Sequence, residues 1–435
     1  MNFSCSPRII LAVTALTLSS AYSQESTGGT LTLARALALT LERSPELATS
    51  FWDIRAAEAQ IIQARLIPNP NVSLSAEDVT GTGDYARGNN AEHTLQLSQL
   101  VQLGGKRAAR TTQAELSRTL AHFDYQVKRV AVLRNTTQAF VDVLVAQRRL
   151  ALAEETVRLW GNAVPLTQKR FEKGAAPEVE LTRASVAVEV AQISLDQSRR
   201  DLLAAKAVLA AQWGETRTIT FESVTGNLDH TEPLPSFTSL VERLGNHPQL
   251  ARWTTEREHR EAVLRVQQAQ VVPDLTVGIG PRIVGGGDSY TMGVISFSLP
   301  LPLFNRNQGN IAEARALLAK ARPEEREIQA RAFGELSVAY QTMRRAADMI
   351  VTLKERILPA AEQTVKLLSE GYSAGRFSQL EILEARRTLT EVRNRHLNAL
   401  ADYHKAVANV EALTAQPVEL HGHLSNSKSK AKGSR

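Results

Sequence analysis

Two acidic side chains stand close together after a glycine turn in the C-terminal part of the sequence. Glu381 and Glu384 are three residues apart, so they share one face if the segment is helical. Two carboxylates on one face attract cations without needing to react with them. Alternatively, Glu384 forms an ion pair with Arg387 on a solvated helix face.

Motifs of catalytic or metal chemistry are missing from the sequence. It has no cluster of Cys and His, no Gly-x-Ser-x-Gly and no His-Glu-x-x-His, and no Ser or Thr follows Gly104-Gly105-Lys106 as in a phosphate-binding loop. His396 has no second ligand at helical spacing, so we interpret it as a hydrogen-bonded core histidine. We therefore expect no enzyme activity, no cofactor and no metal site.

The two ends of the chain differ in composition from the rest. Residues 1–23 have the layout of a secretory signal peptide, and the single cysteine, Cys5, would leave with it. Four of the basic residues behind the net charge of +6 lie in a Ser/Lys-rich tail at 417–435, which we expect to be disordered. Since the body at 24–416 is nearly neutral, its charge pattern argues against nucleic-acid binding.

The sequence is duplicated. Ser44-Pro45 recurs as His247-Pro248, and the turn glycines Gly174 and Gly375 are 201 residues apart. Such a duplication predicts one structural unit used twice, over about 31–215 and 236–416.

Each repeat contains two segments in which apolar and polar residues alternate. Strand pairs are therefore predicted near 71–103 and 275–303, with a glycine-rich loop inside each pair. Long helical segments follow both pairs, the first from Lys106 to about Glu172 and the next from about Glu178. The chain should therefore contain four strands and two long helical hairpins.

A heptad pattern runs along the second helix of each hairpin. Its large positions are Leu181, Val188, Leu195, Leu202 and Leu209 in the first repeat, and Ile382, Leu389, His396, Tyr403 and Val410 in the second. Small residues three positions later allow close approach, so we expect long antiparallel helices packed side by side.

These elements predict a mainly α-helical chain with a small β part. Four strands are too few to close a β-barrel, and an open sheet edge in lipid is very costly. If the strands cross a membrane, identical chains must pool them, and three chains with four strands each would supply twelve.

The order of these features resembles the TolC-type outer-membrane efflux channels over about residues 31–415. The resemblance rests on the duplicated layout, the glycine turns, Leu103-Gly104-Gly105-Lys106-Arg107, and the segment from Leu301-Pro302-Leu303-Phe304 through Asn305-Arg306-Asn307-Gln308-Gly309-Asn310. The last two segments look most similar to the CzcC-like heavy-metal branch.

The resemblance implies a homotrimer with a 12-stranded β-barrel in the outer membrane and an α-barrel of helical hairpins in the periplasm. It implies a passive exit duct for heavy-metal cations, with a periplasmic adaptor protein, an inner-membrane RND-type pump and outer-membrane lipid as partners. Two alternatives remain open: a TolC-like duct for drugs or secreted proteins, and a periplasmic coiled-coil adaptor.

The resemblance also assigns roles to particular residues. Glu381 and Glu384 match the acids of the pore constriction at the periplasmic entrance. Glu180 and Tyr372 match an entrance latch, although Phe377 stands where the family has an arginine. The turns that dock the adaptor would contain Gly174, Ala175, Ala176, Gly375, Arg376 and Phe377.

Each assignment has a simpler alternative. Glu180 could form an ion pair with Arg183, and Tyr372 could be a packed aromatic ring. Glycine in a helix–helix turn is often required by the backbone alone.

Overall fold

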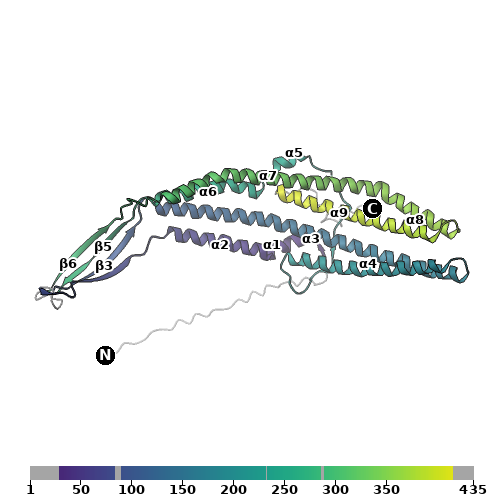
Figure 1. Cartoon of the computed structure of the whole chain (residues 1–435), viewed down its shortest axis with the longest axis horizontal. Coiled ribbons are helices and arrows are strands. Elements are labelled where there is room, and N and C mark those ends of the chain that lie inside the picture. Colours follow the sequence, from purple (N-terminus) through teal and green to yellow (C-terminus); the bar gives the residue numbers. More distant parts are fainter. Residues whose placement is uncertain (1–28, 84–89, 232, 286–288, 415–435) are drawn as a thin grey trace, which may run out of the picture.

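The computed structural model describes residues 29–83, 90–231, 233–285 and 289–414. The predicted signal peptide at 1–23 and the tail at 417–435 lie outside them. The molecule is elongated, with a four-stranded sheet at one end and two helix–helix turns at the other (Figure 1). Among the helices of the described ranges, we find none whose length and apolar character would suit a membrane crossing.

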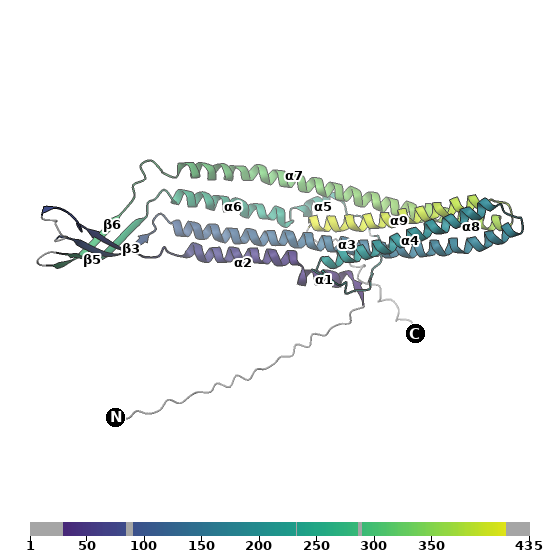
Figure 2. The ribbon, with the colours of Figure 1, turned by 60° about the horizontal axis from the view of Figure 1, so that its bottom comes forward.

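The two halves of the chain contain the same succession of long elements. The first half comprises β1 (Thr30–Thr32), α1 (Leu33–Arg43), α2 (Pro45–Arg65), β2 (Asn71–Glu77), β3 (Glu92–Val101), α3 (Lys106–Glu172), α4 (Glu178–Ala211) and β4 (Ser223–Thr225). The second comprises α5 (Phe237–Leu244), α6 (Pro248–Ala269), β5 (Leu275–Val284), β6 (Tyr290–Ser298), α7 (Gln308–Thr352), η2 (Leu353–Ile357), α8 (Leu358–Ser373) and α9 (Gln379–Thr414). Figure 2 shows the long helices lying side by side.

Local sequence explains where the helices begin. Pro45 and Pro248 occupy the first positions of α2 and α6, where a missing N–H costs nothing. The predicted long helix is a single element of 67 residues that includes Pro165. Its counterpart in the second half is interrupted by the π-helical turn η2, which directly precedes Leu358 and Pro359.

The large positions of the heptad seams are either buried or half-buried. In α4, Leu195 and Leu209 are buried together with the small Ala184 and Ala191. In α9, Ile382, Tyr403 and Val410 are buried in the same frame. The seams therefore hold each hairpin together by packing large residues beside small ones.

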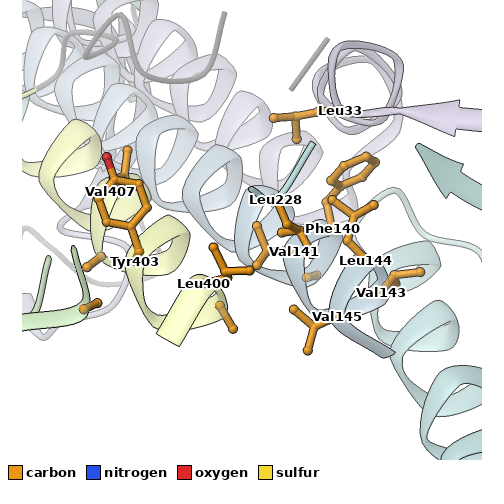
Figure 3. Packing of buried hydrophobic residues seen from close by; sticks show 14 of the residues in the cluster. Leu33, Phe140, Val141, Val143, Leu144, Val145, Leu228, Leu400, Tyr403 and Val407 are labelled. Atoms are coloured by element: carbon orange, nitrogen blue, oxygen red, sulfur yellow. The ribbon is translucent and has the colours of Figure 1, made fainter. Parts of the chain in front are cut away.

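The principal core lies midway along the helices. A run of α3 from Phe140 to Val145 packs against Leu33 of α1, Leu228, and Leu400 of α9 (Figure 3). One part of this layer, the parallel pairing of β1 with β4, was not predicted from the sequence. The side-chain amide of Gln147 continues that pairing, because it accepts from Val224 N at 2.9 Å and donates to Val224 O at 3.2 Å.

The four-stranded sheet has the order β2-β3-β5-β6, so β2 and β6 are its edges. All three pairings are antiparallel, and β3 and β5 join the two repeats. The return strand of the second repeat ends at Ser298, whereas the sequence suggested that the alternation reaches Leu301. Pro300 explains the earlier end, since it has no N–H for a ladder.

The register gives the sheet one apolar and one polar face. Val72 lies opposite Leu97, Leu97 opposite Ile279, and Ile279 opposite Ile295. The other face contains Ser73 opposite Gln96, whose amide donates to Ser296 Oγ at 2.6 Å. Exposure of the apolar residues is high, at 66% for Val72 and 61% for Ile279.

A buried ion pair joins the sheet to the helices. Lys106 Nζ lies 2.8 Å from Asp274 Oδ1, with side-chain exposures of 7% and 21%. The same carboxylate oxygen accepts from Leu103 N at 3.1 Å. Gly104, with φ of 67°, approaches so closely that an added Cβ would lie 2.7 Å from Val272 Cβ. These contacts fix the start of α3 to the start of β5.

Replacing Lys106 with Met should therefore weaken the junction between helices and sheet. We expect the free energy of unfolding to fall by about 2 kcal/mol, because the Asp274 carboxylate loses its cation while remaining largely buried. The midpoint of thermal unfolding measures the effect, and the double variant K106M/D274N should recover part of the loss.

Arg331→Met is the matched control, since its pair with Glu327 is exposed, at 58% and 64%. It should cost less than about 0.5 kcal/mol. Equal unfolding midpoints for K106M and R331M would contradict a structural role for the buried pair.

Candidate functional site at the helical tips

Both helix–helix turns rest on a glycine with a left-handed backbone. Gly174 has φ of 67° and Gly375 has φ of 72°, a conformation that side-chain-bearing residues rarely adopt. Ala175 N donates to Arg170 O, and Arg376 N donates to Gly371 O, both at 2.8 Å. The left-handed backbone of the turns therefore explains by itself why glycine is present at these two positions.

The remaining residues of the turns differ in exposure. Ala176 is buried, while Ala175, Arg376 and Phe377 are exposed. The Phe377 ring also covers Gly371, where an added Cβ would lie 2.3 Å from it. The aromatic ring at the position of the expected arginine thus packs on the preceding helix.

Glu381 caps a helix. Its Oε2 accepts from Ser378 N at 2.8 Å and from Ser378 Oγ at 2.9 Å, while Glu381 N donates to Ser378 Oγ at 3.4 Å. This reciprocal pattern is a capping box at the start of α9. The bonds from the Ser378 backbone and hydroxyl lower the pKa of the fully exposed Glu381 carboxyl.

Glu384 has a different environment although it lies one turn further along α9. It is exposed and lines a groove of about 990 Å³ between α3, α4 and α9. The groove also contains Trp160, Val186, Val190 and Leu383. Within the described ranges no ion pair connects Glu384 to Arg387, so the simpler alternative of mutual neutralisation is wrong in this structure.

Tyr372 connects the two hairpins. It is 7% exposed, and the guanidinium carbon of Arg170 lies 4.3 Å from the centre of its ring. A second bond between hairpins follows, from Gln379 Nε2 to Thr167 Oγ1 at 2.9 Å, and both of these residues are buried. A cation–π contact and a hydrogen bond therefore hold the tips together.

Several polar atoms at the tips are buried without a hydrogen bond. Among the described residues, Glu180 Oε2, Tyr372 Oη and Gln379 Oε1 have no partner. The ion pair that Glu180 was expected to form with Arg183 is not present there either. Each unpaired buried group costs about 1–3 kcal/mol, so the tips are less stable than their packing suggests.

No metal centre is found in the part of the chain that the structure describes, where three or more His, Cys, Asp or Glu nowhere converge. His396 is half-buried on α9, and burial lowers its pKa. Its Nε2 has no hydrogen-bond partner among the described residues, so the expectation of a hydrogen-bonded histidine was wrong.

The structure separates the residues that the sequence grouped together. Glu381 and Glu384 share a helix face but only Glu384 lines the groove. Sequence reasoning missed Arg170, Thr167 and Gln379, which carried no local signal because their partners lie about 200 residues away. Ser378 was also missed, although Ser-x-x-Glu before a helix is a recognisable capping signature.

Comparison with known protein families gives a match in each of the two repeats. The family described as Outer membrane efflux protein matches residues 36–215 and 240–416. The cobalt-zinc-cadmium resistance protein CzcC of Cupriavidus metallidurans is 31% identical over 415 residues, covering 93% of this chain and 97% of the relative. The nickel-cobalt-cadmium resistance protein NccC of Alcaligenes xylosoxydans xylosoxydans is 25% identical over 294 residues, covering 67% and 66%.

Solved structures share the fold. A crystal structure of CusC has a TM-score of 0.74 at 17% identity, covering 92% of this chain and 95% of that one. The conformational changes described for CusC accompany folding and transmembrane channel formation.

The capping box generates a prediction about the first turn of α9. The Ser378 hydroxyl takes part in two of the three hydrogen bonds of the capping box, and Ser378→Ala removes both. Backbone amides at 379–382 should therefore exchange with solvent several-fold faster. Hydrogen exchange of wild type and variant at matched pH measures the effect. Since the pKa of Glu381 is lowered, its stabilisation is present above the ordinary glutamate pKa and disappears as pH falls through the lowered value. The difference between the two proteins should shrink accordingly.

Ser185→Ala is the matched control, because this exposed hydroxyl only donates to Leu181 O within α4. It should leave exchange unchanged. Equal protection of 379–382 in wild type and S378A would contradict the capping role.

Proposed function

Since this chain belongs to the outer membrane efflux protein family, we propose that it is the exit duct of a tripartite efflux system for heavy-metal cations. It resides in the cell outer membrane and extends into the periplasm. In the proposed system an inner-membrane RND-type pump supplies the energy, and a periplasmic adaptor connects the pump to this duct. Residues 24–416 act as one channel protomer of two repeats.

One observation carries the proposal: the sheet has an exposed apolar face, a polar opposite face, and two edges without a neighbouring strand in the described chain. The apolar face suits lipid and the polar face suits a water-filled lumen. Because unpaired backbone groups are very costly in lipid, the edges require strands from other copies. Three copies with four strands each would close a twelve-stranded barrel.

The helices also need neighbours from other copies of the chain, in their case to cover exposed apolar side chains. On α4, Val179, Val186 and Ile193 stand seven residues apart, and they are 52%, 56% and 67% exposed. This stripe lies outside the seam buried within the chain, and apolar stripes at heptad spacing pack against other helices. The stripe therefore supports an α-barrel built from several copies.

The names of two related proteins suggest which substrate is transported. The names of CzcC and NccC connect those proteins with resistance to cobalt, zinc, cadmium and nickel. For this chain we propose divalent heavy-metal cations, and a duct for drugs or secreted proteins is the alternative that transport experiments would reveal. Such a duct needs weak attraction for its cargo, because tight binding would prevent release.

The site residues receive roles in this proposal. Three copies of Glu381 and Glu384 form the negative constriction at the periplasmic entrance. Glu180 and Tyr372 act as the entrance latch, and the Arg170 guanidinium over the Tyr372 ring supports that role by joining the two hairpins. The exposed turn residues Ala175, Arg376 and Phe377 would meet the adaptor.

Cross-linking tests the trimer. The single cysteine, Cys5, lies within the predicted signal peptide, so introduced cysteines should be the only reactive ones in the mature protein. We expect Leu74→Cys on β2, combined with a cysteine at 293, 295 or 297 on β6, to give disulfide-linked trimers in one register. Denaturing electrophoresis without reductant measures the product.

Leu95→Cys with the same β6 cysteines is the control, because β3 already has a strand on both sides. It should give no linkage between chains. Monomers alone from all three β2–β6 combinations would contradict the shared barrel.

Charge selectivity tests the constriction. We expect the variant E381Q/E384Q to lower the cation-to-anion permeability ratio in planar bilayers about two- to fivefold. Glutamine also serves at the third position of a capping box, so Glu381→Gln removes charge while largely keeping the cap. S378A, which weakens the cap and keeps both charges, is the control and should leave the ratio unchanged. An unaltered ratio in E381Q/E384Q would remove these residues from the constriction.

A further inference from the structure

The four strands of the sheet contain three formally charged side chains, Glu77, Glu92 and Arg282. All three belong to the polar face. Glu77 lies directly opposite Glu92, and Arg282 lies opposite Thr94, which shares its face with Gln96. The apolar face therefore presents no Asp, Glu, Lys or Arg from these strands, although it includes His93, which lies opposite Ala76 and Ile283.

The three charges form one group. Arg282 Nη1 lies 2.7 Å from Glu92 Oε2, and Arg282 Nε donates to Thr94 Oγ1 at 3.0 Å. Side-chain exposures of 29% for Arg282 and 26% for Glu92 place the pair partly out of solvent. Glu77 is exposed, and among the described residues it forms no ion pair. Arg282 therefore neutralises one of two carboxylates that face each other.

The group lies at the end of the sheet remote from the helices. Glu77 is the last residue of β2, Glu92 is the first of β3, and Arg282 is two residues from the end of β5. The helical tips with Glu381 and Glu384 are at the opposite end of the molecule (Figure 1). Any charge selectivity at the sheet end is thus physically separate from the proposed entrance constriction.

We propose that Arg282 determines the charge selectivity of the outer end of the duct, by cancelling the charge of Glu92 and leaving that of Glu77. This inference rests on the proposed function, because it requires the polar faces of several copies to enclose a lumen. Two carboxylates and one guanidinium leave a net charge of −1 per chain. This group is then weakly negative, which favours exit of cations without holding them.

Electrostatics gives the direction of each change. Without Arg282, Glu92 and Glu77 both remain charged and the group has a net charge of −2 per chain, so cations are attracted more strongly and released less readily. Without either carboxylate, the net charge is zero and the preference declines. Like charges directly opposite on a sheet also repel, so Arg282 additionally stabilises the pairing of β2 with β3.

The experiment measures the cation-to-anion permeability ratio of the purified full-length protein in planar bilayers under a potassium chloride gradient. Relative to wild type, Arg282→Gln should raise the ratio about two- to fivefold, and Glu77→Gln and Glu92→Gln should each lower it by a similar factor. Raising the salt concentration should reduce all of these differences by screening.

The double variant R282Q/E92Q is the matched control. It removes both members of the ion pair and restores the net charge of −1 per chain, so its ratio should return to that of wild type. If Arg282 only maintained the structure, the double variant would stay displaced together with R282Q. Heat stability of the assembled protein on denaturing gels shows whether each variant is folded.

The outcomes separate this inference from the proposal beneath it. A protein that forms no conducting pore contradicts the proposed function and this assignment with it. A pore whose ratio changes in E381Q/E384Q but not in R282Q, E77Q or E92Q leaves the duct intact and overturns the role of Arg282.

Discussion

Backbone hydrogen bonding at the edges of the sheet is the constraint on which the rest of the structure depends. Within the described residues, β2 and β6 have a neighbour on one side only, while their apolar side chains are exposed. A sheet with this surface is stable in lipid only if its edges are paired. The helical layer likewise leaves apolar side chains exposed, among them Val179, Val186 and Ile193. In the proposed trimer, other copies of the chain would cover both the sheet edges and these stripes.

The junction between the two layers transmits this organisation along the molecule. Lys106 and Asp274 come from different repeats, so their ion pair fixes the first helical hairpin to the second strand pair. Asp274 also accepts from Leu103 N, and Gly104 packs on Val272 without room for a side chain. Sheet and helices therefore meet at a closely packed joint. In the proposed trimer, this joint sets the position of each hairpin relative to the membrane.

Duplication supplied two copies of each element, and the two copies have since taken different forms. At the tips, Ser378 and Glu381 form a capping box, while Pro177 and Glu180 occupy the same places in the first repeat. Proline has no hydroxyl to offer, and Glu180 Oε2 is buried without a hydrogen bond. The first hairpin thus contributes an unsatisfied acid and the second a satisfied one.

The sequence alone determined the long helices, the four strands of the larger sheet and their order. Period-two segments, heptads and proline-marked helix starts are local signals, so the strand pairs, the buried seams and the starts at Pro45 and Pro248 could all be read directly. Local signals also suggested that Glu381 and Glu384 share a face. Only the tertiary structure decided their surroundings: one caps α9 and the other lines a groove. The contacts of Arg170 with Tyr372 and of Arg282 with Glu92 join residues about 200 positions apart. Such partners are set by packing between repeats, which no periodicity within one segment encodes.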